Sequence, residues 1–296
     1  MKFPTGRCLC HYTTREAAFG HILPMRELRM PSLRQMRDPL ENQSWLIGTG
    51  GPAAAEVDSA RRKDQEFAYF HFNLLANSIR ERARLLALTT DAEGYSPDAI
   101  DFSRGWARPR MWENYGENHS GVCLIFDRDR LIENLTRALQ AMDLPTPYHQ
   151  KVRYTETGGS ELTLDLDELV GKVDSDLVAR FIEAHHEEMF FRKALDWATE
   201  YEYRFLVTVP EHHGALQIDY GDSLKAVVVG ERFPGWERPA AHSACRQAGI
   251  EAMRLEWTLG RPALAELPAA GVTREDAERF QAALQASAKS GPTGSA

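Results

Sequence analysis

Short apolar runs and amphipathic segments follow one another along this chain without a regular alternation, and this pattern limits the folds available to it. Residues 121–126 (GVCLIF) are apolar and β-branched and lie between glycine and aspartate, which predicts a strand. Residues 127–142 then carry Leu131, Leu135 and Leu139 at helical spacing. Because strands and helices do not alternate strictly, we expect an α+β fold rather than a doubly wound parallel sheet.

The same reasoning places the other elements. Further strands are expected at residues 7–12, 28–30, 85–90, 152–155, 201–209, 224–229 and 251–258. Further helices are expected from Thr14 to Pro24, at 110–115, within 166–197 and at 240–248. Residues 56–84 fit a helix, although the run FAYFHF within them also alternates as a strand does, so both assignments stay open. Residues 48–52 (GTGGP) are expected to form a flexible connection between elements.

The composition bounds the domain organisation. A chain of 296 residues with 43% hydrophobic residues can bury a full core. We expect a single α+β domain over residues 1–260, followed at 261–296 by a C-terminal helix (273–288) and a disordered tail rich in small and polar residues.

Charge and cysteine content point to a cytoplasmic protein. The net charge of -8 argues against a broad basic face for duplex nucleic acid. The 4 cysteines are too few and too irregular for a disulfide framework, which favours a reducing compartment. The sequence begins without a signal-peptide core and contains no long uncharged apolar run, so we expect neither secretion nor a membrane helix.

Several familiar site motifs are absent from the sequence. There is no dinucleotide-binding glycine pattern after a strand, no Walker loop and no nucleophile elbow. His185 and His186 are adjacent, so on a helix they would point about 100° apart rather than at one ion. We therefore predict no metal site.

The strongest polar signal lies where a helical segment passes into a late strand, at residues 200–204 (EYEYR). Alternation along a strand would place Glu200, Glu202 and Arg204 on one face. Two carboxylates there can stabilise a developing cation, with the arginine keeping one of them ionised. The structural alternative is an ion-pair ladder on a surface strand, which contributes little to stability.

Two further groups of residues are candidates for ligand contacts. His11 ends the first strand and is followed by Tyr12 and Thr13, and a neutral imidazole there can donate to a ribose hydroxyl. Trp112 and Tyr115 lie about one helical turn apart and can either stack on a flat ring or pack beneath a sheet.

Taken in order, several short patterns resemble a bacterial family known as domain of unknown function two-nine-seven-one. The patterns are His11 to Thr13, Asp38 to Glu41, Trp112 to Tyr115 with Gly121 to Cys123, Lys151 to Tyr154, Lys193 to Arg204, and Val227 to Gly230. The resemblance extends from about Cys8 to Thr258, and it departs from the family at Arg37, where asparagine is usual before Asp-Pro. The family supplies no activity.

A more distant likeness is to ADP-ribosyltransferase folds, including toxins that modify DNA. Their opening His-Tyr-Thr strand and late Glu-x-Glu are similar to His11-Tyr12-Thr13 and to Glu200-Tyr201-Glu202. The likeness implies a mixed α+β, split-sheet core with peripheral helices and NAD as the substrate.

The likeness also implies roles for individual residues. Glu202 would stabilise the ribose cation and Glu200 would position or deprotonate the acceptor, because cleavage of the nicotinamide–ribose bond passes through an oxocarbenium-like state. His11 would hold the ribose, and Tyr12 or Tyr115 would stack on nicotinamide, with Thr13, Trp112 and Arg204 nearby. Arg29, Arg34 or Arg37 would pair with the pyrophosphate, and the sequence does not choose among them.

The leading hypothesis is therefore an enzyme of a bacterial toxin or antiphage-defence type that transfers ADP-ribose from NAD to a protein or nucleic acid, with an antitoxin or defence protein as a partner. One alternative is a non-catalytic module that senses a ligand or binds a protein. Another is a Mg²⁺-dependent nuclease built on Asp38, Glu41, Glu200 and Glu202.

Overall fold

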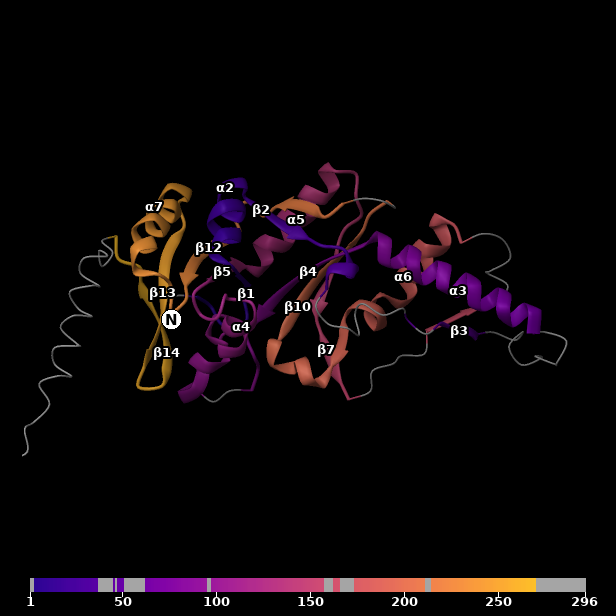
Figure 1. Ribbon diagram of the computed structural model, residues 1–296, viewed down its shortest axis with the longest axis horizontal. Helices are drawn as coiled ribbons and strands as arrows, with labels where there is room; N and C mark the ends of the chain where they lie inside the picture. Colours follow the sequence, from indigo (N-terminus) through magenta and orange to yellow (C-terminus); the bar gives the residue numbers. More distant parts are fainter. Residues whose placement is uncertain are drawn as a thin grey trace, which may run out of the picture. The chain divides into compact units, whose positions relative to one another are not determined.

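The computed structural model describes residues 3–36, 45, 47–50, 62–94, 97–156, 162–165, 173–210 and 214–269. These residues form a mixed α+β protein, which confirms the expected fold class (Figure 1). The chain divides into two compact units, the first made of 1–26, 92–127 and 223–296 and the second of 27–91 and 128–222. Neither unit is continuous in sequence. The single domain expected over residues 1–260 stays a prediction.

Unit 1 is built on a mixed sheet whose strand order is β14-β13-β12-β5-β1. Its strands are β1 (Cys8–Thr13), β5 (Val122–Asp127), β12 (Leu224–Val229), β13 (Glu251–Thr258) and β14 (Arg261–Glu266). Its helical segments are α1 (Arg15–Ala17), η1 (Ala18–Ile22), α2 (Leu23–Met25), η5 (Pro97–Ser103), η6 (Gly105–Ala107), α4 (Pro109–Asn114), η9 (Gly235–Glu237) and α7 (Arg238–Ala248). β12 and β13 run parallel, and the other neighbours pair antiparallel.

The parallel pair of unit 1 is connected through α7, which packs on β13 (Figure 1). The helix ends where the sequence predicts, because Gly249 takes the left-handed conformation with φ of 70°. β14 was not expected: it pairs back on β13 through a turn in which Leu259 and Gly260 both have positive φ. The expected helix at 273–288 lies outside the described residues.

Unit 2 carries antiparallel strands in the order β4-β10-β6, together with three two-stranded pairs. Its strands are β2 (Glu27–Met30), β3 (Ile47–Gly50), β4 (Ala83–Thr90), β6 (Tyr148–Lys151), β7 (Arg153–Thr155), β8 (Leu162–Asp165), β9 (Arg192–Ala194), β10 (Glu202–Thr208) and β11 (Leu216–Asp219). Its helical segments are η2 (Leu33–Gln35), α3 (Arg62–Arg82), α5 (Arg128–Ala141), α6 (Ser175–Phe190) and η8 (Leu195–Glu200).

The structure decides two local questions in unit 2. Residues 56–84 fitted both a helix and a strand in the sequence analysis. The structure forms the helix α3 within this segment. The expectation of a flexible connection at 48–52 is wrong for Gly48 to Gly50, which belong to the strand β3 and pair with β8. Ladder hydrogen bonds join backbone groups, so small residues do not prevent this pairing.

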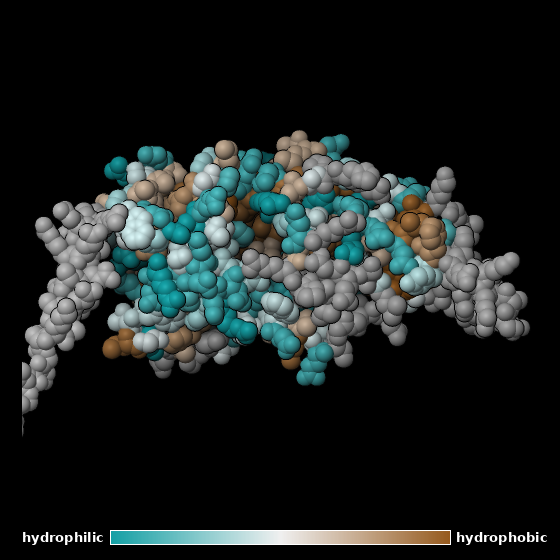
Figure 2. Space-filling model, viewed as in Figure 1, coloured by the Kyte–Doolittle hydropathy of each residue, from teal (hydrophilic) through white to brown (hydrophobic). Residues whose placement is uncertain are grey.

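Each unit has its own buried core. In unit 1 buried residues of β1, β5, β12 and β13 form one core cluster with Trp112, which is 0% exposed. In unit 2, α3 and α6 pack on strand residues such as Leu85 and Leu206. Figure 2 shows hydrophobic side chains at the surface in the region where Figure 1 draws α3 and α6, and Tyr69 and Phe70 of α3 are exposed.

Candidate functional site

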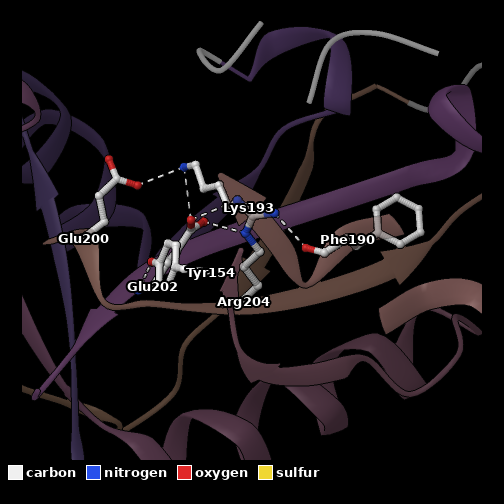
Figure 3. Close-up of polar contacts among 6 residues, drawn as sticks. All are labelled: Tyr154, Phe190, Lys193, Glu200, Glu202 and Arg204. Atoms are coloured by element: carbon white, nitrogen blue, oxygen red, sulfur yellow. Dashed lines mark hydrogen bonds and ion pairs between the residues drawn. The ribbon is translucent and has the colours of Figure 1, made fainter. Parts of the chain in front are cut away.

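Four charged side chains meet in unit 2 around the start of β10. Lys193 of β9 donates from Nζ to Glu200 Oε2 at 2.9 Å and to Glu202 Oε2 at 3.2 Å (Figure 3). The lysine therefore bridges both carboxylates of the acidic segment that the sequence singles out. We refer to Lys193, Glu200, Glu202 and Arg204 as the charge cluster.

Arg204 completes the charge cluster from the same strand as Glu202. Its Nε and Nη2 atoms donate to the two oxygens of Glu202 at 2.6 and 2.9 Å, a bidentate arrangement. Its Nη1 atom donates to the backbone carbonyl of Phe190, at the end of α6, at 2.7 Å. Glu202 is thus held by two cations at once.

The backbone explains how the two carboxylates come to lie together. Glu200 belongs to η8 rather than to the strand, and Tyr201, between the carboxylates, takes the left-handed conformation with φ of 48°. The prediction that Glu200 shares a strand face with Glu202 is therefore wrong, because Glu200 does not belong to the strand. The carboxylates meet because the chain turns sharply at Tyr201, and only Glu202 and Arg204 share a face through strand alternation.

Burial makes this arrangement different from a surface ladder. The relative exposures are 8% for Lys193, 6% for Glu200, 5% for Glu202 and 2% for Arg204. Buried charges are strongly unfavourable unless they are paired and hydrogen-bonded. Two cations and two carboxylates balance in formal charge, so the charge cluster satisfies that requirement.

The charge cluster also fixes the ionisation of Glu202. Burial alone would raise the pKa of this carboxyl, but the charges and hydrogen bonds of Arg204 and Lys193 outweigh it and lower the pKa below its ordinary value. Tyr154 lies alongside, and its hydroxyl accepts the Glu202 backbone N–H at 2.9 Å. Burial raises the pKa of Tyr154, so this hydroxyl stays protonated.

An aromatic ring lies against the same ammonium. The Nζ atom of Lys193 is 4.6 Å from the centre of the Trp197 ring, within the range of a cation–π interaction. Trp197 itself is half-buried. The position of the ammonium is thus a cation site made of two carboxylates and an indole face.

Sequence reasoning missed Lys193, Trp197 and Tyr154 as members of this site. A signal for the lysine was present, because two carboxylates and one arginine leave a net negative charge, and burial of the group requires a second cation. Lys193 is seven residues before Glu200 in the same conspicuous segment. The roles of Trp197 and Tyr154 depend on packing and carry no comparable signal.

The histidine, threonine and aromatic candidates lie in unit 1, and two of them, Tyr12 and Trp112, belong to its core. Tyr12 is 6% exposed and donates its hydroxyl to the Gly105 carbonyl at 2.6 Å, and its ring meets Trp112 edge to face at 5.1 Å. Trp112 donates Nε1 to the Trp106 carbonyl at 2.8 Å. Both side chains thus have structural partners within unit 1.

The other unit 1 candidates are more accessible. His11 and Thr13 lie in β1, and Tyr115 follows α4; all three are half-buried. Of the arginines considered for the pyrophosphate, Arg29 lies in β2 of unit 2 and bonds Gln35. The side chain of Arg34 and the whole of Arg37, Asp38 and Glu41 lie outside the described residues.

Among the residues that the structure describes, no group of three or more His, Cys, Asp or Glu side chains is arranged to hold a metal ion. None of the described helices is long and apolar enough to cross a membrane.

Comparisons with known proteins identify one segment of the chain. No curated protein and no solved structure matches the sequence. A family model does match, over residues 111–205, a range that contains Trp112, Tyr154 and the whole charge cluster. Over residues 111–205 the chain is similar to the family described as protein of unknown function (DUF2971).

Proposed function

We propose that this chain cleaves the bond between nicotinamide and ribose in NAD and transfers ADP-ribose to a macromolecule. The observation that carries the proposal is the cation site of unit 2, where Glu200, Glu202 and Trp197 surround one positive charge. The proposal includes a split-sheet core of the ADP-ribosyltransferase type and a role in bacterial toxicity or antiphage defence, with an antitoxin or defence protein as a partner.

The chemistry of NAD suits the charge of the site and its aromatic face. The nicotinamide ring is flat and cationic, so it can replace the Lys193 ammonium beside the Trp197 face. When the glycosidic bond breaks, its electron pair leaves with the ring nitrogen, and positive charge develops on the ribose. Carboxylates already arranged around a cation stabilise that charge without reorganisation.

Each carboxylate has a distinct role in this mechanism. Glu202, which the bidentate pair with Arg204 keeps ionised, stabilises the developing ribose cation. Glu200 takes the proton from the acceptor group as the new bond to the ribose carbon forms. The proposal rests on unit 2 alone and requires no contribution from His11 or the unit 1 aromatics.

Release of nicotinamide tests the proposal directly. The full chain is incubated with NAD and either water, DNA or cell protein as the acceptor, and nicotinamide is measured by chromatography. Glu202→Gln is expected to reduce release by about 100-fold or more, the usual effect of removing one preorganised electrostatic group. Glu188→Gln is the matched control, because Glu188 also pairs with two arginines in unit 2 but lies outside the charge cluster.

Folding must be separated from chemistry in this experiment. Thermal unfolding of each variant shows whether Glu202→Gln remains folded, and calorimetry shows whether the wild-type chain binds NAD. A wild-type chain that neither binds NAD nor releases nicotinamide would overturn the proposal.

One observation favours a second function, that of a non-catalytic module which senses a ligand or binds a protein. Both carboxylates are less than a tenth exposed and are already paired with cations. In that case the charge cluster holds the fold together. A Glu200→Gln, Glu202→Gln double variant that remains folded and retains full growth inhibition or phage protection in a bacterial host would support this second function and contradict the first.

A further inference from the structure

A hollow of about 340 Å³ lies in unit 1, and none of the residues used in the mechanism above lines it. It is lined by residues of β13, by the first residue of α7 and by the segment that follows β12. Among its lining residues are Gly230, Glu231, Arg238, Arg254, Glu256 and Trp257. The volume is that of a small-molecule site.

Two arginines face this hollow with donor groups that the described residues do not use. The Nε atoms of Arg238 and Arg254 are both buried and lack a hydrogen-bond partner in the described part of the chain. Arg238 Nη2 donates to the Phe233 carbonyl over a long 3.5 Å, and Arg254 Nη2 pairs with Glu256. A buried donor without a partner is unfavourable, which makes a ligand with acceptor oxygens a natural complement.

The charges around the hollow also favour a ligand with acceptor oxygens. Burial lowers the pKa of Arg238, and repulsion from Arg254 lowers it further, so the two guanidinium groups are close enough to oppose each other. Arg238 is also the first residue of α7, an 11-residue helix without a side-chain cap, where the helix dipole disfavours a cation. The positive charges therefore reinforce one another at this point.

The neighbouring carboxylates neutralise this charge only in part. Glu256 is engaged by Arg254, and Glu237, just before α7, pairs with Arg15. Glu231 is exposed. A multiply charged anion with several oxygens would relieve the repulsion between the two arginines and accept from both.

We propose that this hollow binds the phosphate group of a small molecule. A phosphate offers three terminal oxygens, enough to accept from Arg238 and Arg254 together, and guanidinium forks suit that geometry. Trp257 is half-buried in the lining, next to the buried Leu255, so an apolar or aromatic remainder of the ligand has a surface to contact. The proposal rests on unit 1 alone and is independent of the action on NAD.

Titration of the full chain with inorganic phosphate, phenyl phosphate and acetate tests the inference, with binding followed by NMR and calorimetry at constant ionic strength. We expect phosphate to bind, phenyl phosphate to bind more tightly, and acetate to bind at least 10-fold more weakly. Arg238→Gln and Arg254→Gln should each weaken phosphate binding about 10-fold or more, since each removes charge-assisted hydrogen bonds. Arg246→Gln, an exposed position on the same helix, should leave binding unchanged.

Arg254→Lys serves as a second variant, because it keeps the charge but loses the fork and the Nε donor. It should bind phosphate more weakly than wild type even if Arg254→Gln fails to fold. The absence of phosphate and phenyl phosphate binding at millimolar concentration would overturn the inference. An affinity for acetate equal to that for phosphate would overturn the inference as well. So would a loss of phosphate affinity in Arg246→Gln equal to that in Arg238→Gln.

Discussion

At the scale of single residues, the main feature of unit 2 is the pairing of the buried charges in the charge cluster. Lys193 is the only one of the four charge-cluster residues that does not lie in the segment 200–204, yet it contacts both carboxylates. A buried ion pair contributes little net stability compared with apolar packing, but removing one partner leaves an uncompensated charge. Lys193 therefore controls the stability of this part of unit 2.

Replacing Lys193 by methionine should destabilise the protein by about 3 to 5 kcal/mol, because Glu200 and Glu202 lose their shared ammonium. Urea denaturation followed by circular dichroism measures this change. Combining Lys193→Met with Glu200→Gln should recover part of the loss, since it restores charge balance. Arg153→Gln is the control: it removes an exposed pair with Glu188 and should lower the free energy of unfolding by less than about 1 kcal/mol. A similar loss of stability in Lys193→Met and Arg153→Gln would argue against a special role for the charge cluster.

The lowered pKa of Glu202 predicts how stability depends on pH. The folded carboxyl has a pKa below the ordinary 4.5, so on acidification the unfolded chain takes up the proton first. The stabilisation is complete above that ordinary value and is lost as pH falls through the lower folded pKa. The free energy of unfolding, measured from pH 7 to pH 3, should fall less steeply in Glu202→Gln than in wild type at the acidic end. Parallel curves would contradict this assignment.

At the scale of elements, two glycines allow the loop before β5 to approach its neighbours closely. A Cβ on Gly230 would lie 2.1 Å from the carbonyl oxygen of His119, and one on Gly121 would lie 2.5 Å from that of Thr13. The loop is itself unusual, since Glu117, Asn118 and His119 all have positive φ. Close backbone approach, rather than side-chain chemistry, thus accounts for glycine at both positions.

Gly230→Ala should destabilise unit 1 by about 1 to 3 kcal/mol or more, because the added methyl group overlaps backbone atoms that cannot move aside. Thermal unfolding measures the effect. Gly20→Ala is the matched control in the same unit: it meets nothing within 4 Å and lies in a helical segment. Alanine there should be neutral or stabilising by up to about 1 kcal/mol. An equal loss at both glycines would contradict the steric explanation.

At the scale of the whole molecule, the chain passes from one unit to the other at residues 26/27, 91/92, 127/128 and 222/223. The family match over 111–205 covers part of each unit. That segment contains β5 without its neighbours β1 and β12, and β10 without its neighbour β4. The segment that the family model matches therefore does not correspond to a folding unit of this chain.

An isolated fragment of residues 111–205 should consequently fail to fold cooperatively, because β5 and β10 would expose apolar faces and unpaired edges. Its unfolding, followed by circular dichroism in urea, should lack the sigmoidal transition of the full chain. The chain over residues 1–269 is the control and should retain that transition. A cooperative transition in the fragment would show that the match is an autonomous domain.

The sequence by itself determined the elements with strong local patterns. β5, α5, β10, β12 and α7 all lie where periodicity and flanking residues predict them, and the segment 193–204 holds the main polar site. These properties depend on neighbours within one or two turns of the chain, which a sequence displays directly. β3, β6 and β8 have only 4 residues each, and β14 depends on its pairing with β13 at the edge of the sheet, which local pattern does not reveal.

Only the tertiary structure decided what surrounds the acidic segment. It turned an expected strand face into a buried cluster by bending the chain at Tyr201 and placing the Lys193 ammonium against both carboxylates and the Trp197 ring. It also divided the chain into two discontinuous units and placed Arg238 beside Arg254 around one hollow. Burial and long-range contacts set charge pairing and pKa, and neither is encoded in the spacing of residues along the chain.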